Sequence, residues 1–400
     1  MMNRFPIEDF AHMTPKPRGA KRSRLLLLLV PLAFAALFFF MPDGNSGSEI
    51  IPPKGRALSA NDLVHIDESL VGTHKLTIDT GLQLFVAQTA ERYRVYHGAV
   101  AVMNPRTGDI LALYGTGVNG EDCRLALKAD LAASVFKIVT AVAAMEQGGF
   151  GPDSVFSYTG GAHTLYKNQL QDRRDRWTAD ITLADAFARS NNVVFAKLGT
   201  RHLGETPVLL TAMKMGFWRS PLEEVSCEPS SVFLPRDEYS LAELASGFNR
   251  RTKITPVHAA QMVSAALNRG YMVTPRLVRD GAVETEQVMS EATAHRLLLL
   301  MERTVRCGTL AGEFRSAGSD RVLRNLTIGA KSGSIDGDDP RGRRNWFVGF
   351  ARDENTGEAI AIGCLLVLDE RFWNQADTFS RLIIRKYFSR LEQGTAERSG

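Results

Sequence analysis

The strand patterns of this sequence lie at its two ends, and helical patterns fill the middle. Two short apolar runs, 98–104 and 109–114, are joined by the strong turn sequence Asn104-Pro-Arg-Thr-Gly108 and predict a hairpin. Three more strands are predicted at 326–331, 346–351 and 358–368. The order predicts an α/β fold of the α+β type, in which a five-stranded antiparallel sheet is assembled from both ends, flanked by helices and interrupted by an inserted helical subdomain.

Apolar periodicity predicts the helices. Thr255-Pro256 is a good start signal, because threonine caps the helix and proline fits its first position. Helices are expected at 79–96, 134–147, 182–198, 241–248, 256–268, 291–305 and 378–391.

A charge-free stretch from Leu25 to Met41, about seventeen residues, is at the short end of what spans a bilayer as a single helix. Basic residues crowd its N-terminal side and Asp43 follows it, so the tail is expected in the cytoplasm and the rest of the chain on the extracytoplasmic side of the cell membrane. The alternative is a cleaved signal peptide, for which Ala33-Phe34-Ala35 offers a nominal site.

These features predict a cytoplasmic tail at 1–24, a transmembrane helix at 25–41, a linker at 42–70 and one folded domain at 71–400. The net charge of +4 comes in part from the tail, so no nucleic-acid partner is expected. The cysteines are dispersed and no His-Glu-x-x-His occurs, so no metal or other cofactor is predicted.

Ser134-Val135-Phe136-Lys137 places a serine and a lysine on one helix face, one turn apart and within hydrogen-bond reach. A lysine in that position can accept the proton of a nucleophilic serine. It must first lose its own proton, so its pKa must be lowered, either by desolvation or by a position near Lys331. The apolar flank of Val135, Phe136, Ile138 and Val139 makes this plausible. The alternative is an ordinary N-cap serine.

Two further short motifs follow in order, Ser190-Asn191-Asn192 and Lys331-Ser332-Gly333. Taken alone, the first is more often a polar turn or cap, and the second a surface lysine before a glycine turn. Each is weak by itself, as the chance copy Ser59-Ala60-Asn61 shows. Their order along the chain is the stronger signal.

With these motifs the chain resembles the transpeptidase domain of penicillin-binding proteins, which are penicillin-recognising serine enzymes, from about Lys75 to the end. The resemblance is also carried by the hairpin from Gly98 to Ala112, by Gly247-Phe-Asn leading to Ile254-Thr-Pro, and by Trp346-Phe-Val-Gly-Phe350. It implies a five-stranded antiparallel sheet between helices, in agreement with the strand pattern.

The resemblance also implies roles for the motif residues. Ser134 would be the nucleophile and Lys137 its base, with Ser190 projecting beside Lys137 as a proton relay to the leaving amine. Asn192 would bind the substrate amide, and Lys331 and Ser332 its terminal carboxylate. Gly333 would allow close approach, and the Ser334 N–H would complete an oxyanion hole with that of Ser134.

Three departures from the family pattern stand out. Ala132-Ala133 replaces the usual proline-glycine turn before the nucleophile, so the start of the helix is not fixed. Ser332 replaces the commoner threonine but still supplies a hydroxyl. We also expect no glycosyltransferase domain and no long pedestal before the catalytic part.

The resemblance implies a monofunctional, membrane-anchored serine D,D-transpeptidase that cross-links peptidoglycan stem peptides and is inhibited by β-lactam antibiotics such as penicillin. The alternatives are hydrolysis, by a D,D-carboxypeptidase or β-lactamase, and a non-catalytic β-lactam sensor or scaffold. A separate membrane glycosyltransferase is the expected partner, because cross-linking is useful where glycan is being made.

The other notable side chains are expected to have structural roles. The charged run from Asp336 to Arg344 is expected to be a solvated loop, with substrate steering as the alternative. Trp177 and Tyr166 are expected in core or surface packing, with a substrate groove as the alternative, and Cys364 as a buried thiol.

Overall fold

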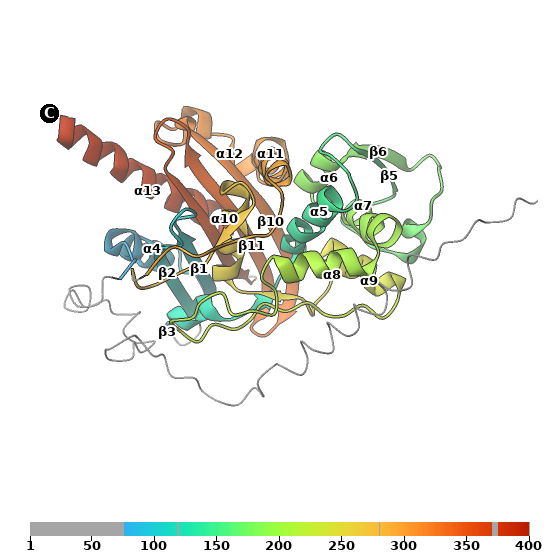
Figure 1. Cartoon of the computed structure of the whole chain (residues 1–400), viewed down its shortest axis with the longest axis horizontal. Helices are drawn as coiled ribbons and strands as arrows, with labels where there is room; N and C mark the ends of the chain where they lie inside the picture. Colours follow the sequence, from blue (N-terminus) through green and yellow to red (C-terminus); the bar gives the residue numbers. More distant parts are fainter. Residues whose placement is uncertain (1–75, 118–119, 280, 370–374, 400) are drawn as a thin grey trace, which may run out of the picture. The chain divides into compact units, whose positions relative to one another are not determined.

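The computed structural model describes residues 76–117, 120–279, 281–369 and 375–399, shown in colour in Figure 1. The predicted tail, transmembrane helix and linker lie outside these residues. Within the described ranges, none of the helices has the length and apolar content needed to cross a bilayer.

The centre of the fold is an antiparallel sheet with the strand order β10-β11-β12-β1-β2-β3 (Figure 1). Pairing of β1 with β12 joins the two ends of the chain, as the sequence predicts. The five predicted strands are confirmed, and a two-residue sixth strand, β3, extends the edge beyond β2. The strands are β1 His97–Met103, β2 Ile110–Gly117, β3 Gly120–Glu121, β10 Leu326–Asp338, β11 Arg341–Asp353 and β12 Ala359–Leu368.

Each face of the sheet packs against its own helices, because successive strand residues point to opposite faces. Val100 and Val102 belong to a core shared with α4 (Thr80–Arg92) and α13 (Ala376–Ser399), which lie on the same side of the sheet in Figure 1. Ala99 and Ala101 face the other way, into a core that includes Val257 of α10.

α10 (Pro256–Leu267) begins as predicted: the Thr255 side chain accepts a hydrogen bond from the His258 N–H, and Pro256 occupies the first turn. α11 (Glu291–Cys307) follows and lies close to β10, where a Cβ on Gly329 would approach the Glu302 backbone nitrogen to 3.0 Å. A short helix, α12 (Ala311–Phe314), comes next.

The inserted helical subdomain lies beside β10 and α11 (Figure 1). The helix predicted at 182–198 is wrong as one element, because Ser190 adopts φ 54° and the Asn191 side chain starts a new helix by accepting from the Val194 N–H. α8 was not predicted. The helices are α5 Lys137–Glu146, α6 Leu183–Ala188, α7 Asn192–Lys197, α8 Glu205–Lys214 and α9 Glu238–Ser246, with a π-helical turn at Leu198–Leu203.

Short elements complete the described chain. Two-stranded ladders join β4 Asp130–Leu131 to β7 Lys253–Ile254, β5 Val155–Thr159 to β6 Thr178–Thr182, and β8 Tyr271–Val273 to β9 Thr285–Gln287. The 3₁₀ turns are Cys123–Leu127, Ala133–Phe136, Lys167–Leu170, Ala317–Ser319 and Leu323–Asn325.

The sequence predicts a solvated loop for the charged run from Asp336 to Arg344. Its charged side chains are exposed except for Arg344, but the run is the end of a β-hairpin and not a loop. Strands β10 and β11 continue through most of it and are joined at Asp339-Pro340, which is a cis peptide. Arg344 is 1% exposed, and its Nε donates to Asp130 Oδ1 at 2.9 Å. The arginine is buried because it joins β11 to β4, directly before the segment that carries Ser134.

Candidate active site

Ser134 lies in the 3₁₀ turn Ala133–Phe136, which leads directly into α5 at Lys137. Ala133 adopts φ 49°, a conformation that is strained for a residue with a Cβ. Gly247, at φ 66°, ends α9 against this turn, and a Cβ there would lie 2.1 Å from the Ala133 carbonyl oxygen. On the other side, a Cβ on Gly333 would meet Val135 Cγ2 at 3.1 Å. The nucleophile turn therefore fits between α9 and β10 because both neighbours are glycines.

Lys137 is 0% exposed, and its Nζ has three polar neighbours. Ser134 Oγ lies at 2.8 Å, Asn192 Oδ1 at 2.8 Å and the Ser246 carbonyl oxygen at 2.6 Å. The Asn192 orientation is fixed, because its Nδ2 donates to the His163 carbonyl oxygen at 2.8 Å and so turns Oδ1 toward the lysine. Residues from three segments, the turn at 134–137, the segment 190–192 and the end of α9, thus meet at one amine.

This arrangement suits a neutral amine. Asn192 Oδ1 and the Ser246 oxygen can only accept, so they use two N–H groups of Lys137. The third neighbour, the Ser134 hydroxyl, can donate, and it then points its proton at the lone pair of Nζ. The geometry is that of a base set to take the serine's proton.

The environment lowers the pKa of Lys137 well below its usual value, first through burial and second through the like charge of Lys331. The flanking side chains Val135, Phe136, Ile138 and Val139 are at most 1% exposed. Lys137 itself is 0% exposed, as the expected desolvation requires, and its Nζ lies 5.7 Å from the centre of the Phe195 ring.

Lys331 is also 0% exposed and has different partners. Its Nζ donates to Ser190 Oγ at 3.1 Å and to the Ser332 carbonyl oxygen at 2.7 Å, and it lies 5.6 Å from the centre of the Phe187 ring. Burial lowers its pKa to about 7. With this pKa, Lys331 can gain or lose a proton near neutral pH, next to the Ser190 hydroxyl.

The three residues of the motif at 190–192 make different contacts. Ser190 meets Lys331, Asn191 caps α7, and Asn192 meets Lys137. From the sequence we expect Ser190 beside Lys137 and Asn192 on the substrate amide, and both stay predictions. The turn at Ser190, with φ 54°, separates these two side chains, so that Ser190 contacts Lys331 and Asn192 contacts Lys137.

On β10, the Ser332 hydroxyl lies 2.5 Å from Thr309 Oγ1, and the Ser334 hydroxyl accepts from Arg343 Nε at 2.6 Å. Both serines lie on the outer strand of the sheet. All eight sequence-predicted site residues therefore lie in the turn at 134–137, the segment 190–192 and the part of β10 that faces them: Ser134, Lys137, Ser190, Asn192, Lys331, Ser332, Gly333 and Ser334.

Sequence reasoning missed two contributors, Ser246 and Thr309. Ser246 precedes the αL glycine that ends α9, so its carbonyl is one of the terminal carbonyls that no helix N–H can reach. The glycine was a signal for this. Thr309 follows α11 directly, and its N–H donates to the Ala188 carbonyl oxygen at 3.0 Å. Its place depends on tertiary packing, and no local pattern indicates it.

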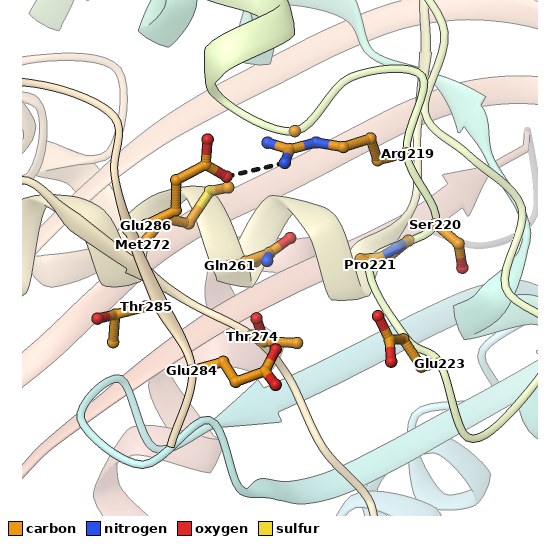
Figure 2. A pocket seen from close by; sticks show the side chains of 11 residues that line it. Arg219, Ser220, Pro221, Glu223, Gln261, Met272, Thr274, Glu284, Thr285 and Glu286 are labelled. Carbon is orange, nitrogen blue, oxygen red and sulfur yellow. Dashed lines mark hydrogen bonds and ion pairs between the residues drawn. The ribbon is translucent and has the colours of Figure 1, made fainter. Parts of the chain in front are cut away.

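Two aromatic residues considered for a substrate groove, Trp177 and Tyr166, lie at the surface and are 65% and 62% exposed. A pocket of about 270 Å³ lies elsewhere, between α10, the β8–β9 hairpin and the loop at 216–223 (Figure 2). Arg219 and Glu286 form an ion pair across it, and none of the motif residues lines it. Among the described residues there is no cluster of three or more metal-ligating side chains.

Comparison with known proteins gives a family match over most of the chain. The family model described as penicillin binding protein transpeptidase domain matches residues 98–371. Penicillin-binding protein PbpB of Mycolicibacterium smegmatis is 26% identical over 320 residues, 73% of this chain and 48% of that protein. Stage V sporulation protein D of Bacillus subtilis is 23% identical over 290 residues, 65% of this chain and 44% of that protein. The chain thus spans about half the length of these relatives.

Solved structures share the fold. The crystal structure of PBPA from Mycobacterium tuberculosis aligns with a TM-score of 0.62 and 19% identity, over 84% of this chain and 88% of that chain. The D,D-transpeptidase domain of a peptidoglycan glycosyltransferase from Eggerthella lenta aligns with a TM-score of 0.61 and 19% identity, over 87% and 90%. With the family model covering well over half of the sequence, this chain belongs to the penicillin-binding protein transpeptidase family.

Proposed function

We propose that the chain is a serine-type D,D-transpeptidase that cross-links peptidoglycan stem peptides through an acyl-enzyme on Ser134 and is covalently inhibited by penicillin. The observation that carries the proposal is the 2.8 Å contact between Ser134 Oγ and Lys137 Nζ, in a setting where the lysine's other neighbours only accept hydrogen bonds. Membership of the penicillin-binding protein transpeptidase family supports the proposal.

In the proposed reaction, Ser134 Oγ attacks the carbonyl of the penultimate D-alanine while its proton passes to Lys137. The Ser134 and Ser334 N–H groups hold the developing oxyanion, and the Ser332 hydroxyl holds the terminal carboxylate. The C–N bond breaks as the leaving D-alanine nitrogen takes a proton from Ser190, which Lys331 replenishes at 3.1 Å. An amine of a second stem then attacks the ester, and the same groups act in reverse.

The test is made with the purified protein. Fluorescent penicillin should label the wild type, and Ser134→Ala should abolish the label. Lys137→Ala should slow acylation by at least about 10²-fold, the usual contribution of a positioned general base. Retained labelling of Ser134→Ala would remove that serine from the nucleophile role.

A second measurement identifies the reaction. Given a stem-peptide donor and acceptor, the wild type should form a cross-linked dimer and release D-alanine. Release of D-alanine without a dimer would favour a D,D-carboxypeptidase. Rapid turnover of penicillin would favour a β-lactamase. Stable acylation with neither a dimer nor turnover would favour a sensor or scaffold.

We further propose that Leu25 to Met41 anchors the chain in the cell membrane with the catalytic domain outside the cytoplasm, and that it works beside a separate membrane glycosyltransferase. The support is the basic cluster before Leu25 and the charge-free run after it. A reporter fused after residue 60 should be active only outside the cytoplasm. Replacing Leu25–Met41 with an unrelated spanning helix should weaken recovery of the glycosyltransferase, and unchanged recovery would leave the segment as an anchor only.

A further inference from the structure

A groove with a volume of about 720 Å³ lies beside the first residues of β10, between α11, α12 and the 3₁₀ turns that follow. We call it the β10 groove and define it by Arg306, Ala311, Phe314, Arg315, Arg324 and Thr327. It adjoins the candidate active site along the chain, because Ala311 is two residues beyond Thr309, which contacts Ser332.

Three arginines give the groove its charge. Arg306, Arg315 and Arg324 are exposed, and the ion pairs found among the described residues include none of them. Nearby arginines are different: Arg303, Arg381 and Arg385 each contact a carboxylate, at 2.7, 2.6 and 2.9 Å. Glu302 is the one acidic side chain that lines the groove. Three arginines against one carboxylate leave the groove with an excess of positive charge, suited to an anionic ligand.

The wall of the groove is the edge of the sheet. β10 is the outer strand, and its residues Leu326, Thr327 and Ile328 line the groove. An outer strand presents backbone N–H and C=O groups that can pair with an extended peptide. Val305 and Phe314 add apolar surface beneath it. The groove thus offers backbone pairing, apolar contact and positive charge together.

The order of residues along β10 indicates which peptide would lie there, given the proposed function. The oxyanion position is at Ser334 and the carboxylate of the leaving D-alanine at Ser332. In the same direction, toward the start of β10, Ile328 lies four residues before Ser332, a distance of about 13 Å at the usual rise of a strand. The groove is therefore on the leaving-group side of the reacting carbonyl.

The incoming amine must approach from that side. Attack on the acyl-enzyme reverses the departure of D-alanine, so the amine takes the place that the D-alanine nitrogen left and uses the same proton donor and acceptor. The remainder of the acceptor then extends away from the acyl group, past Ser332 and Thr309. We propose that the β10 groove binds the acceptor stem, a peptide with a free amine and several carboxylates, and that Arg306, Arg315 and Arg324 recognise those carboxylates.

The experiment compares two acceptors on one acyl-enzyme, using the full-length protein in detergent and a stem-peptide donor. D-alanine is small enough to use only the space at Ser332, whereas an anionic stem peptide with a free side-chain amine would reach the groove. The double variant Arg306→Glu/Arg324→Glu should reduce transfer to the stem peptide about tenfold, chiefly through its KM, because each lost exposed charge contact is worth up to about 1 kcal/mol. Transfer to D-alanine and acylation by penicillin should stay within about twofold of the wild type.

Arg321→Glu is the matched control, since Arg321 is equally exposed, lies three residues before Arg324 and does not line the groove. It should leave both transfers unchanged. Equal effects on the two acceptors, or no effect of the double variant, would overturn the acceptor site while leaving the proposed function intact. Failure of the wild type to transfer to either acceptor would refute the proposed function, and the acceptor site with it.

Discussion

The two buried lysines of the site divide the work through their different partners. Lys137 is held by oxygen atoms that accept and by the Ser134 hydroxyl, whereas Lys331 faces Ser190 and its own strand. Both have pKa values below the usual range for lysine because both are buried, and Lys331 also acts on Lys137 as a like charge. The protonation state of Lys331 therefore changes the basicity of Lys137.

This coupling predicts the pH dependence of acylation. A lysine whose pKa is lowered loses its proton at lower pH, so the fraction of neutral Lys137, and with it the rate of acylation, should rise with pH to a plateau, which ends where Lys331 loses the proton that the leaving nitrogen needs. Lys331 is protonated below its pKa of about 7, and there its charge lowers the pKa of Lys137 further. Lys331→Met should therefore move the acid limb of the rate profile to higher pH, besides lowering the plateau. The second-order rate constant for fluorescent penicillin, measured from pH 5 to 9, gives both quantities, and a lower plateau with an unmoved limb would contradict the coupling.

For single residues, the sequence predicted the identity of the site residues better than their hydrogen-bond partners. Ser134 with Lys137, and Lys331 on a strand, follow from local spacing and burial pattern. The pairing of Ser190 with Lys331 does not, because it depends on a positive φ at Ser190, which no propensity for serine favours. Ala133 is a similar case: the family's glycine would fit φ 49°, and here alanine is held there by its neighbours.

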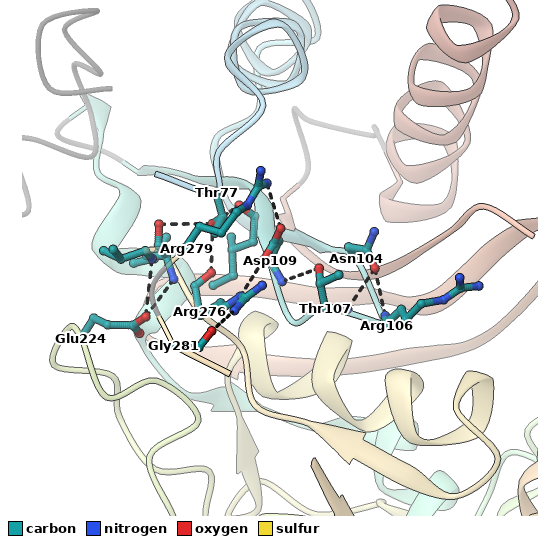
Figure 3. Close-up of polar contacts among 12 residues, drawn as sticks. Thr77, Asn104, Arg106, Thr107, Asp109, Glu224, Arg276, Arg279 and Gly281 are labelled. Carbon is teal, nitrogen blue, oxygen red and sulfur yellow. Dashed lines mark hydrogen bonds and ion pairs between the residues drawn. The ribbon is translucent and has the colours of Figure 1, made fainter. Parts of the chain in front are cut away.

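Among the elements, the first hairpin is fastened to the segment after β8 by one buried carboxylate. Asp109, 5% exposed, contacts Arg276 Nε at 2.6 Å and Arg279 at 2.9 Å (Figure 3). Thr77 supports the same corner, since its hydroxyl contacts the carbonyl oxygens of Ile110 and Arg276, each at 2.9 Å. The hairpin was predicted from its turn sequence, but this attachment joins residues far apart in the chain and has no local signature.

The two ion pairs of Asp109 should differ in their contribution to stability. Arg276 has a side chain only 15% exposed, so Asp109→Ala leaves a largely buried charge unpaired and should lower the free energy of unfolding by about 3 kcal/mol. Arg279 is 58% exposed, and Arg279→Ala should cost less than about 1 kcal/mol. Urea unfolding of the two variants beside the wild type measures the difference. Equal losses would show that the buried pair is not the main attachment.

For the molecule as a whole, the site exists only when the sheet and the helical insert are joined. Ser134 lies in the turn that precedes the insert, Lys137, Asn192 and Ser246 belong to the insert, and Lys331 lies on the sheet. The strand order at both chain ends predicted the sheet, and apolar periodicity predicted most of the insert. Neither predicted the contact of Lys331 with Ser190 across the two, because it depends on tertiary packing. The contacts of Arg344 and Trp346 with the segment before Ser134 were not predicted either.

Trp346 provides a test of this connection. It is 1% exposed, and its Nε1 donates to the Leu131 carbonyl oxygen at 2.8 Å, three residues before Ser134. Trp346→Phe removes this donor, leaves a buried carbonyl without it, and opens a small cavity, so the free energy of unfolding should fall by about 2–4 kcal/mol. Because the nucleophile turn loses its anchor to β11, acylation should also slow, by about tenfold at a temperature where the variant remains folded.

The matched control makes the same change at an exposed site. Trp177 is 65% exposed on the insert, and Trp177→Phe should leave both unfolding and acylation within error of the wild type. Thermal unfolding followed by circular dichroism gives the first quantity, and the rate of labelling by fluorescent penicillin gives the second. If Trp346→Phe lowers stability but acylates at the wild-type rate, the tryptophan supports the fold without positioning Ser134. In that case the alignment of the nucleophile would rest on Gly247 and Gly333, the two close contacts that hold the turn from either side.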